Sequence, residues 1–173
     1  INEPPIIIAD EEICVIAGEK ISLEIGVDDP NQNQKVKFSA TGGPFTVENP
    51  AVLIGPKLFT PVPFTERLEW QTDCNHISDQ YYQIVLRAAD STGLATLKTI
   101  RIKVVGPPPE NLQAATDNGA VRLEWDAPYD CEVTKNNYFQ KFSVWRKIAS
   151  TTFSPDTCNP GLTGSPYQKI AYK

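Results

Sequence analysis

Apolar and polar side chains alternate with a period of two along most of the chain before residue 106, which is the pattern of strands that bury one face. No long stripe with the 3.6-residue period of an amphipathic helix interrupts this alternation. The strand signals are the apolar run 6–8, Ile13 and Val15, Ile21 to Val27, Val36 to Ala40, Leu68 and Trp70, Tyr82 to Ala88, and Ile100 to Val104. The sequence therefore predicts an all-β sandwich, with Ile13 and Val15 on an edge strand.

Two places in this pattern are irregular. Four prolines lie between Phe45 and Phe64, which favours one short strand at residues 45–47 and then a loop that crosses a sheet edge. Leu97 is out of phase with Ile100 on the last strand, and a β-bulge would account for the shift.

Three consecutive prolines, Pro107, Pro108 and Pro109, end the alternation. Their fixed φ and missing backbone donors exclude them from a sheet ladder and favour a stiff polyproline-II spacer. We therefore predict a domain boundary here, with one domain in residues 1–106 and a second in residues 107–173.

The second domain has fewer strand signals than the first. Alternation predicts strands around Leu112 and Ala114, from Val121 to Trp125, around Phe142 and Val144, and at residues 167–172. About seven strands are needed to close a sandwich of this kind, so we expect the second domain to be incomplete, in a chain that is a processed or excised piece. Another chain, a swapped copy or the first domain is expected to cover the face of Val121, Leu123, Trp125, Phe142 and Val144.

Three groups of sequence strings carry resemblances to known families. The first domain resembles the cadherin-like and Ig-like modules of bacterial surface proteins in DDPNQNQKVKFSATGG, YxIxLxAxD and TIRIKV. The second resembles the opening of a fibronectin type III domain in PPPENLQAATDNGAVRLEWDAP, where the family places the tryptophan, here Trp125, in the core. It also resembles modules of gliding-motility and surface proteins of Bacteroidota, exported by the type IX secretion system, in YDC, SVWRK and SPDTCNPGLTGSPYQKI. The implied architecture is a pair of tandem Ig-like β-sandwiches, the second a partial fibronectin type III-like domain.

The four cysteines, Cys14, Cys74, Cys131 and Cys158, lack the spacing of zinc ligands. We predict one disulfide in each domain, Cys14–Cys74 and Cys131–Cys158, and hence an extracytoplasmic location, with free buried thiols as the alternative. The Ig-like topology implies the first pair, because it brings the two connections to the same end. The second pair requires the insertion around Cys158 to fold back along the sheet.

The cadherin-like resemblance implies calcium at domain junctions, with Asp28, Asp29, Asn31 and Asp90 as candidate ligands. Oxygen donors suit this hard cation. The proline spacer, however, lacks the Asp-rich linker of the family, and glutamines stand where further carboxylates are expected. Turn residues that hydrogen-bond their own backbone are the alternative, so we expect no cofactor, with calcium left open.

Two other residues invite a functional interpretation. Trp70 alternates with Leu68, which favours the core over carbohydrate stacking. His76 lies in a polar segment without a catalytic partner at a recognisable spacing, which predicts a solvated loop histidine. With no nucleophile elbow, phosphate loop or metal cluster in the sequence, we predict that the chain is not an enzyme.

We therefore expect a non-catalytic spacer of a large secreted, extracellular cell-surface protein, of the adhesion or gliding-motility type, on the outer surface of a Gram-negative bacterium. The alternatives are a glycan-binding or adhesive module that uses Tyr129, Tyr138, Phe139 and Trp145, or an accessory domain of a secreted hydrolase. Expected partners are neighbouring domains of the same protein, another chain, a glycan or a surface protein. The formal net charge of −5 argues against nucleic acid as a partner, and no apolar run reaches the ~20 residues of a membrane span.

Overall fold

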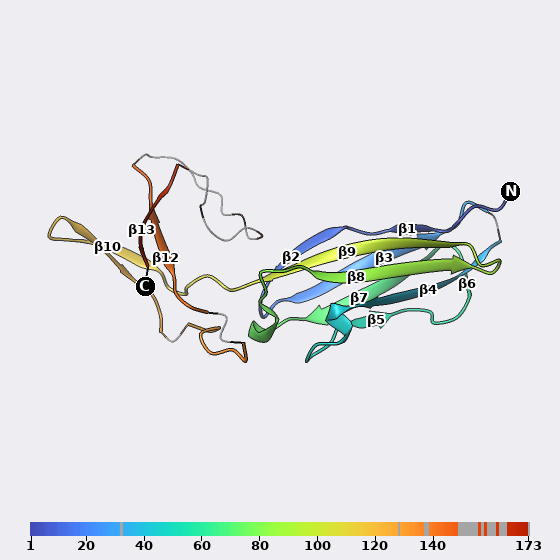
Figure 1. Cartoon of the computed structure of the whole chain (residues 1–173), viewed down its shortest axis with the longest axis horizontal. Helices are drawn as coiled ribbons and strands as arrows, with labels where there is room; N and C mark the ends of the chain where they lie inside the picture. Colours follow the sequence, from blue (N-terminus) through green and yellow to red (C-terminus); the bar gives the residue numbers. More distant parts are fainter. Residues whose placement is uncertain are drawn as a thin grey trace.

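The computed structural model describes residues 1–31, 33–127, 129–136, 139–148, 156, 158, 162 and 166–172. Its first nine strands form two sheets stacked face to face (Figure 1). One sheet has the order β1-β3-β7-β5, with bounds Ile6–Ile8, Lys20–Asp28, Phe64–Gln71 and Val52–Ile54. The other has the order β2-β9-β8-β4-β6, with bounds Glu12–Ile16, Ala95–Val105, Tyr82–Asp90, Lys35–Gly42 and Thr60–Pro61. The prediction of an all-β fold is confirmed.

The core lies between these two sheets and is built from the alternating apolar positions. Ile25, Leu68, Ile84 and Ile100 are fully buried, and Trp70 is 1% exposed. The Trp70 ring meets Tyr82 edge-on with the ring centroids 5.1 Å apart, and its indole nitrogen donates to a backbone carbonyl. Trp70 is therefore a core residue, as the alternation predicted.

The chain changes sheets between β1 and β2. Strand β1 pairs antiparallel with β3, whereas β2 pairs parallel with β9, with Ile13 opposite Ile102. The backbone bonds from Arg101 N to Glu11 O and from Ala17 N to Val105 O, both 2.8 Å, extend this parallel pairing at its two ends. The edge position predicted for Ile13 and Val15 is confirmed.

The two irregular places differ from expectation. The strand predicted at residues 45–47 is wrong: Gly43–Phe45 forms a 3₁₀ turn, η1, with Pro44 in its first turn, and the short strand is β5 instead. The predicted bulge at Leu97 is also wrong, because β8 and β9 pair without a register shift and Leu97 lies opposite Arg87. Leu97 is 65% exposed, so it is an apolar residue on the outer face of the sheet.

Beyond the prolines the chain forms two separate two-stranded sheets. Strands β10 (Gln113–Asp117) and β11 (Ala120–Glu124) make a hairpin, and Asn118 and Gly119 at its turn have positive φ angles of 46° and 82°. Both signs match a type I′ turn. Strands β12 (Ser143–Arg146) and β13 (Gln168–Tyr172) form the other sheet.

The apolar face predicted for the second part is only partly covered. Val121 is 67% exposed, and the other four residues of the face, Leu123, Trp125, Phe142 and Val144, are half-buried. Trp125, just after β11, meets Phe142, just before β12, edge-on with ring centroids 5.3 Å apart. The full burial expected for Trp125 is not seen, because two small two-stranded sheets enclose less volume than the two facing sheets of a complete sandwich.

Candidate functional site

A disulfide links the first sandwich to the segment beyond the prolines. Cys74, in the 3₁₀ turn η2 (Cys74–His76), is bonded to Cys131 with the Cα atoms 5.3 Å apart. The predicted pairs Cys14–Cys74 and Cys131–Cys158 are therefore wrong. Cys131 is 1% exposed and packs against the core of the sandwich. This packing places Cys131 beside Cys74 in η2 and not beside its predicted partner, Cys158.

Other contacts reinforce this connection, and we call η2, Pro107 and residues 129–135 the joint. The Tyr129 hydroxyl donates to the Pro107 carbonyl at 2.6 Å. The backbone N–H of Lys135 donates to Asn75 Oδ1 at 2.9 Å, and the Lys135 ammonium pairs with Glu48. Burial, aided by the neighbouring Asp130 carboxylate, raises the pKa of Tyr129. The joint is thus closed by a covalent bond, by hydrogen bonds and by packing.

The 3₁₀ turn η2 is held in shape by a reciprocal cap. Asp73 Oδ1 accepts from the backbone N–H of Asn75 at 2.7 Å, and the backbone N–H of Asp73 donates to His76 Nδ1 at 2.9 Å. Because Nδ1 accepts, Nε2 carries the proton and donates to the Glu48 carbonyl at 2.7 Å. His76 is 2% exposed, so the prediction of a solvated loop histidine is wrong: its ring is a buried part of the wall on which the joint rests.

The calcium candidates gather at the opposite end of the sandwich, where they bind the backbone. Asp29 Oδ1 accepts from the N–H of Asn31, and Asp28 Oδ1 from the N–H of Asp29, both at 2.8 Å. Asp90 Oδ1 accepts three bonds from residues 92 and 94, and its Oδ2 accepts from Asn2. Burial acts to raise the pKa of Asp90, but these hydrogen bonds outweigh it and lower the pKa.

This arrangement matches the turn-residue alternative for Asp28, Asp29 and Asp90, whose oxygens accept from nearby backbone N–H groups. The side-chain oxygen of Asn31 likewise accepts from the backbone N–H of Glu3 at 2.8 Å. Among the described residues no three acidic, histidine or cysteine side chains gather as a metal site. Asp28 and Asp29 therefore hold the turn that follows β3, whereas Asn31 and Asp90 tie the N-terminal segment to the turns that follow β3 and β8.

The aromatic candidates of the second part do not share one surface. Tyr129 packs against Phe139 and Phe142 at centroid distances of 4.8 and 5.0 Å, with interplanar angles of 39° and 83°. Trp145 lies apart from them, on β12, with the Lys169 ammonium 4.8 Å from its ring centroid. Tyr138 lies outside the described residues. Sugar stacking uses a free ring face, whereas the described rings mostly face one another or a lysine.

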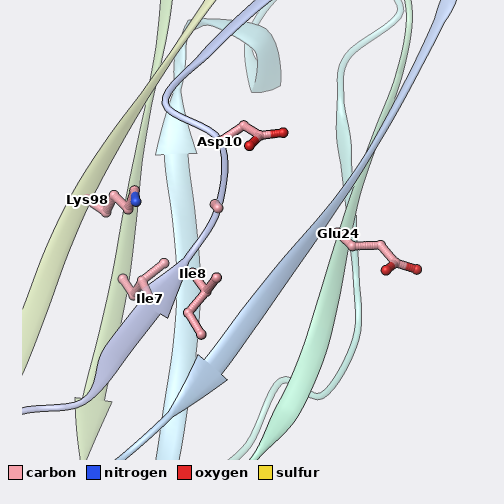
Figure 2. Close-up of a pocket in the computed structure, with 6 residues that line it drawn as sticks. Ile7, Ile8, Asp10, Glu24 and Lys98 are labelled. Carbon is pink, nitrogen blue, oxygen red and sulfur yellow. The ribbon is translucent and has the colours of Figure 1, made fainter.

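A groove of about 460 Å³ lies where the chain crosses from β1 to β2. Figure 2 shows Ile7 and Ile8 side by side in it, with the carboxylates of Asp10 and Glu24 directed away from them. Lys98 at its far side pairs with Glu11 at 3.4 Å. The polar groups of the groove therefore do not converge on one point, as they do in a specific small-molecule site.

One buried carboxyl group, Glu66, escaped the sequence analysis. Glu66 is 1% exposed on β7, and its Oε1 has no hydrogen-bond partner among the described residues. Gly55 packs so closely on it that a Cβ atom there would lie 1.9 Å from Glu66 Oε2. Burial raises the pKa of Glu66. Its position, in phase with Leu68 and Trp70, was the signal that could have predicted its inward orientation.

The buried histidine also had a sequence signal. Asp73 precedes His76 by three residues, which is the spacing of a reciprocal cap. The partner of Cys74 had no such local signal, because Cys131 lies 57 residues away in the sequence.

No family model matches the sequence, and no curated protein matches it significantly. Among solved structures, the SrpA adhesin of Streptococcus sanguinis has a TM-score of 0.50 and 18% identity, over 65% of this chain and 64% of that one. The chain has an Ig-like β-sandwich fold, of the kind found in bacterial adhesins.

Two further structures are more distant. The sialic acid binding region of a Streptococcus sanguinis SK1 adhesin, solved with 3'sLn bound, has a TM-score of 0.49 and 13% identity, over 72% of this chain and 44% of that one. The BIgI domain of the β protein of S. agalactiae, solved with CEACAM1 bound, has a TM-score of 0.39 and 16% identity, over 59% and 99%. The chain thus spans less than two thirds of the length of both S. sanguinis structures. The described part of the chain contains no helix long and apolar enough to cross a membrane.

Proposed function

We propose that this chain is a rigid, non-catalytic structural module of an extracellular cell-surface protein. The joint carries this proposal. A spacer holds its neighbouring domains at a fixed distance and orientation only if its own parts do not move relative to each other. The Cys74–Cys131 bond fixes η2 to residues 129–135 in this way. The Tyr129 hydrogen bond to Pro107 adds a second constraint next to the stiff prolines.

The chemistry of the described residues supports a structural role. Cys74 and Cys131 form a disulfide, and Cys131 is buried. Stable disulfides are typical of proteins outside the cytoplasm. The carboxyl groups with shifted pKa values, such as Glu66, Asp73 and Asp90, lie apart from one another, and each serves a local structural contact or is simply buried. Catalytic sites instead bring such groups together in one cleft.

The proposed cellular location and export route rest on the sequence resemblances. The second part resembles modules of Bacteroidota surface and gliding-motility proteins, which favours the outer surface of a Gram-negative bacterium and export by the type IX secretion system. Neighbouring domains of the same protein are then the main partners. They also provide a natural cover for the exposed Val121.

Relaxation of backbone ¹⁵N nuclei in the intact chain tests rigidity directly. We expect the amides of β8 and β11 to report one shared overall tumbling time, since the joint couples the two parts. Independent, faster tumbling of β10–β13 in the oxidised protein would overturn the spacer proposal.

An adhesive module is the second candidate, and the groove beside β1 favours it. Ile8 in the groove is 63% exposed and Ile6, on the same strand, is 46% exposed, so an apolar strip is available to a glycan or a surface protein. A screen of the intact chain against glycans and host surface proteins distinguishes the two functions. Saturable binding that Ile8→Ser removes, while the fold is kept, would favour the adhesive module.

A further inference from the structure

Two thiols remain once Cys74 and Cys131 are paired, and they are neighbours. Cys14 and Cys158 are each half-buried. Their side chains are hydrogen-bonded to each other although the residues lie at opposite ends of the sequence. Cys14 is in β2, opposite Lys103 of β9, so Cys158 lies against the five-stranded sheet of the first sandwich.

Further interactions place Asp156 and Cys158 on the same surface. The backbone N–H of Cys158 donates to Asp156 Oδ1 at 2.9 Å, and the Asp156 carboxylate interacts electrostatically with Cys14. Cys158 also interacts with Tyr81, whose hydroxyl donates to Glu12 of β2 at 2.7 Å. Two residues of the first sandwich, Cys14 and Tyr81, thus interact with Asp156 or Cys158 in addition to the hydrogen bond between the two thiols.

We propose that Cys14 and Cys158 form a second disulfide that ties the segment containing Asp156 and Cys158 to strand β2. Strand β2 and η2 lie at the same end of the sandwich, next to the chain that leads to β10 (Figure 1). Together with Cys74–Cys131, the new bond would attach the later part of the chain to two places on the first sandwich, the turn η2 and strand β2. The bond does not depend on the spacer proposal, because it needs only the adjacent thiols and an oxidant.

The two cysteines have different roles in forming the bond. Burial, followed by the hydrogen bond to Cys158, raises the pKa of Cys14 to about 12, against a lowering effect of Lys103. The thiolate is the nucleophile in disulfide exchange, so Cys14 is the poorer first nucleophile. The thiolate of Cys158 therefore attacks a disulfide of an extracytoplasmic oxidant, of the glutathione or thiol-oxidoreductase class.

The reaction then proceeds through a mixed disulfide. The first attack joins the Cys158 sulfur to one sulfur of the oxidant and releases the other as a thiolate. Cys14 gives up its proton and attacks the Cys158 sulfur, which expels the second thiolate of the oxidant. Two cysteine thiols and one oxidant disulfide thus become one protein disulfide and two oxidant thiols, with two electrons passed to the oxidant.

The test uses the intact chain with Cys74–Cys131 formed, equilibrated with oxidised and reduced glutathione. Mass spectrometry of a non-reduced digest should find the peptides of Cys14 and Cys158 joined within one chain, and thiol titration should fall from two groups to none. Two persistent free thiols in fully oxidised glutathione would overturn the proposal. Linkage of these residues between two chains would overturn it equally.

Matched single variants test the order of attack. Cys14→Ser should accumulate a glutathione adduct on Cys158 at least ~10-fold faster than Cys158→Ser accumulates one on Cys14, since nucleophilic attack requires the thiolate and burial, the largest cause of the raised pKa of Cys14, remains in Cys158→Ser. Equal or reversed rates would overturn the assignment of Cys158 as the attacking residue. The folded state of each variant is checked by the unchanged β signal in circular dichroism.

Discussion

The Tyr129 hydroxyl lies 2.6 Å from the Pro107 carbonyl oxygen, so a residue after the proline spacer hydrogen-bonds the spacer itself. The same hydroxyl packs on Gly106, where an added Cβ atom would lie 2.8 Å from it. Two residues further on, Cys131 is bonded to Cys74. The segment after β11 therefore returns to the first sandwich. Its Tyr129 contacts the start of the spacer, and its Cys131 is bonded to the sandwich itself.

Removing the joint disulfide should loosen the later part of the chain more than the sandwich. The bond spans 57 residues, and the chain-entropy model assigns such a loop about 4 kcal/mol of stability. We expect Cys74→Ser with Cys131→Ser to lower Tm by several degrees and to make residues 129–135 sensitive to protease. Both are measured by thermal circular dichroism and limited proteolysis, and an unchanged Tm and cleavage pattern would contradict the structural role of the bond.

Glu66 should make the fold more stable at mildly acidic pH. Its folded-state pKa lies above the ordinary value of 4.5, so the ionised form destabilises the folded protein at pH 7. This cost is relieved as the pH falls through the raised pKa and is gone below 4.5. Each pKa unit by which the folded state exceeds the unfolded state corresponds to about 1.4 kcal/mol of folding free energy.

The matched measurement is the free energy of unfolding in urea from pH 8 to pH 5. We expect it to rise toward pH 5 in the unmodified protein and to change less in Glu66→Gln, which has no charge to bury. Carboxyl groups with lowered pKa values, such as Asp73 and Asp90, lose their contribution only at lower pH. Parallel profiles for the two proteins would show that Glu66 is not the cause.

Gly42 should tolerate no side chain. Its φ is +149°, and a Cβ atom there would lie 2.1 Å from Gln83 O and 2.9 Å from Ile84 Cα, both backbone atoms of the neighbouring strand. We expect Gly42→Ala to cost about 2–4 kcal/mol in urea unfolding. Gly93→Ala is the control, because Gly93 also has a positive φ but no atom within 4 Å, and we expect a cost of only about 1 kcal/mol. Equal costs would contradict the close approach at Gly42.

Calcium and chelators should leave Tm unchanged. Calcium takes six to eight oxygen ligands, whereas the Asp90 oxygens and one oxygen each of Asp28 and Asp29 already accept hydrogen bonds. Differential scanning calorimetry with calcium and then with EDTA measures this. A saturable rise of Tm in calcium that Asp29→Asn abolishes would restore the cadherin-like interpretation.

The period-two alternation by itself determined the all-β class, most of the inward residues of the sandwich and the core role of Trp70, although Ile6 and Ile8 of the first apolar run are exposed. It determined these because alternation decides which face of a strand is buried, and burial of apolar surface is the main driving force of folding. The positive-φ turn at Asn118 and Gly119 is equally local, since it depends on two adjacent residues.

Only the tertiary structure decided the parallel pairing of β2 with β9, the burial of His76 and the Cys74–Cys131 bond. Alternation carries no information about which distant strand lies alongside, and a cysteine pairs with whichever thiol the finished fold brings within bonding distance. The alternation also placed Glu66 inward by its phase, but only the packing of Gly55 against it showed how closely its carboxyl group is enclosed by protein. Contacts between segments far apart in the sequence depend on the whole fold, and the joint is built almost entirely from such contacts.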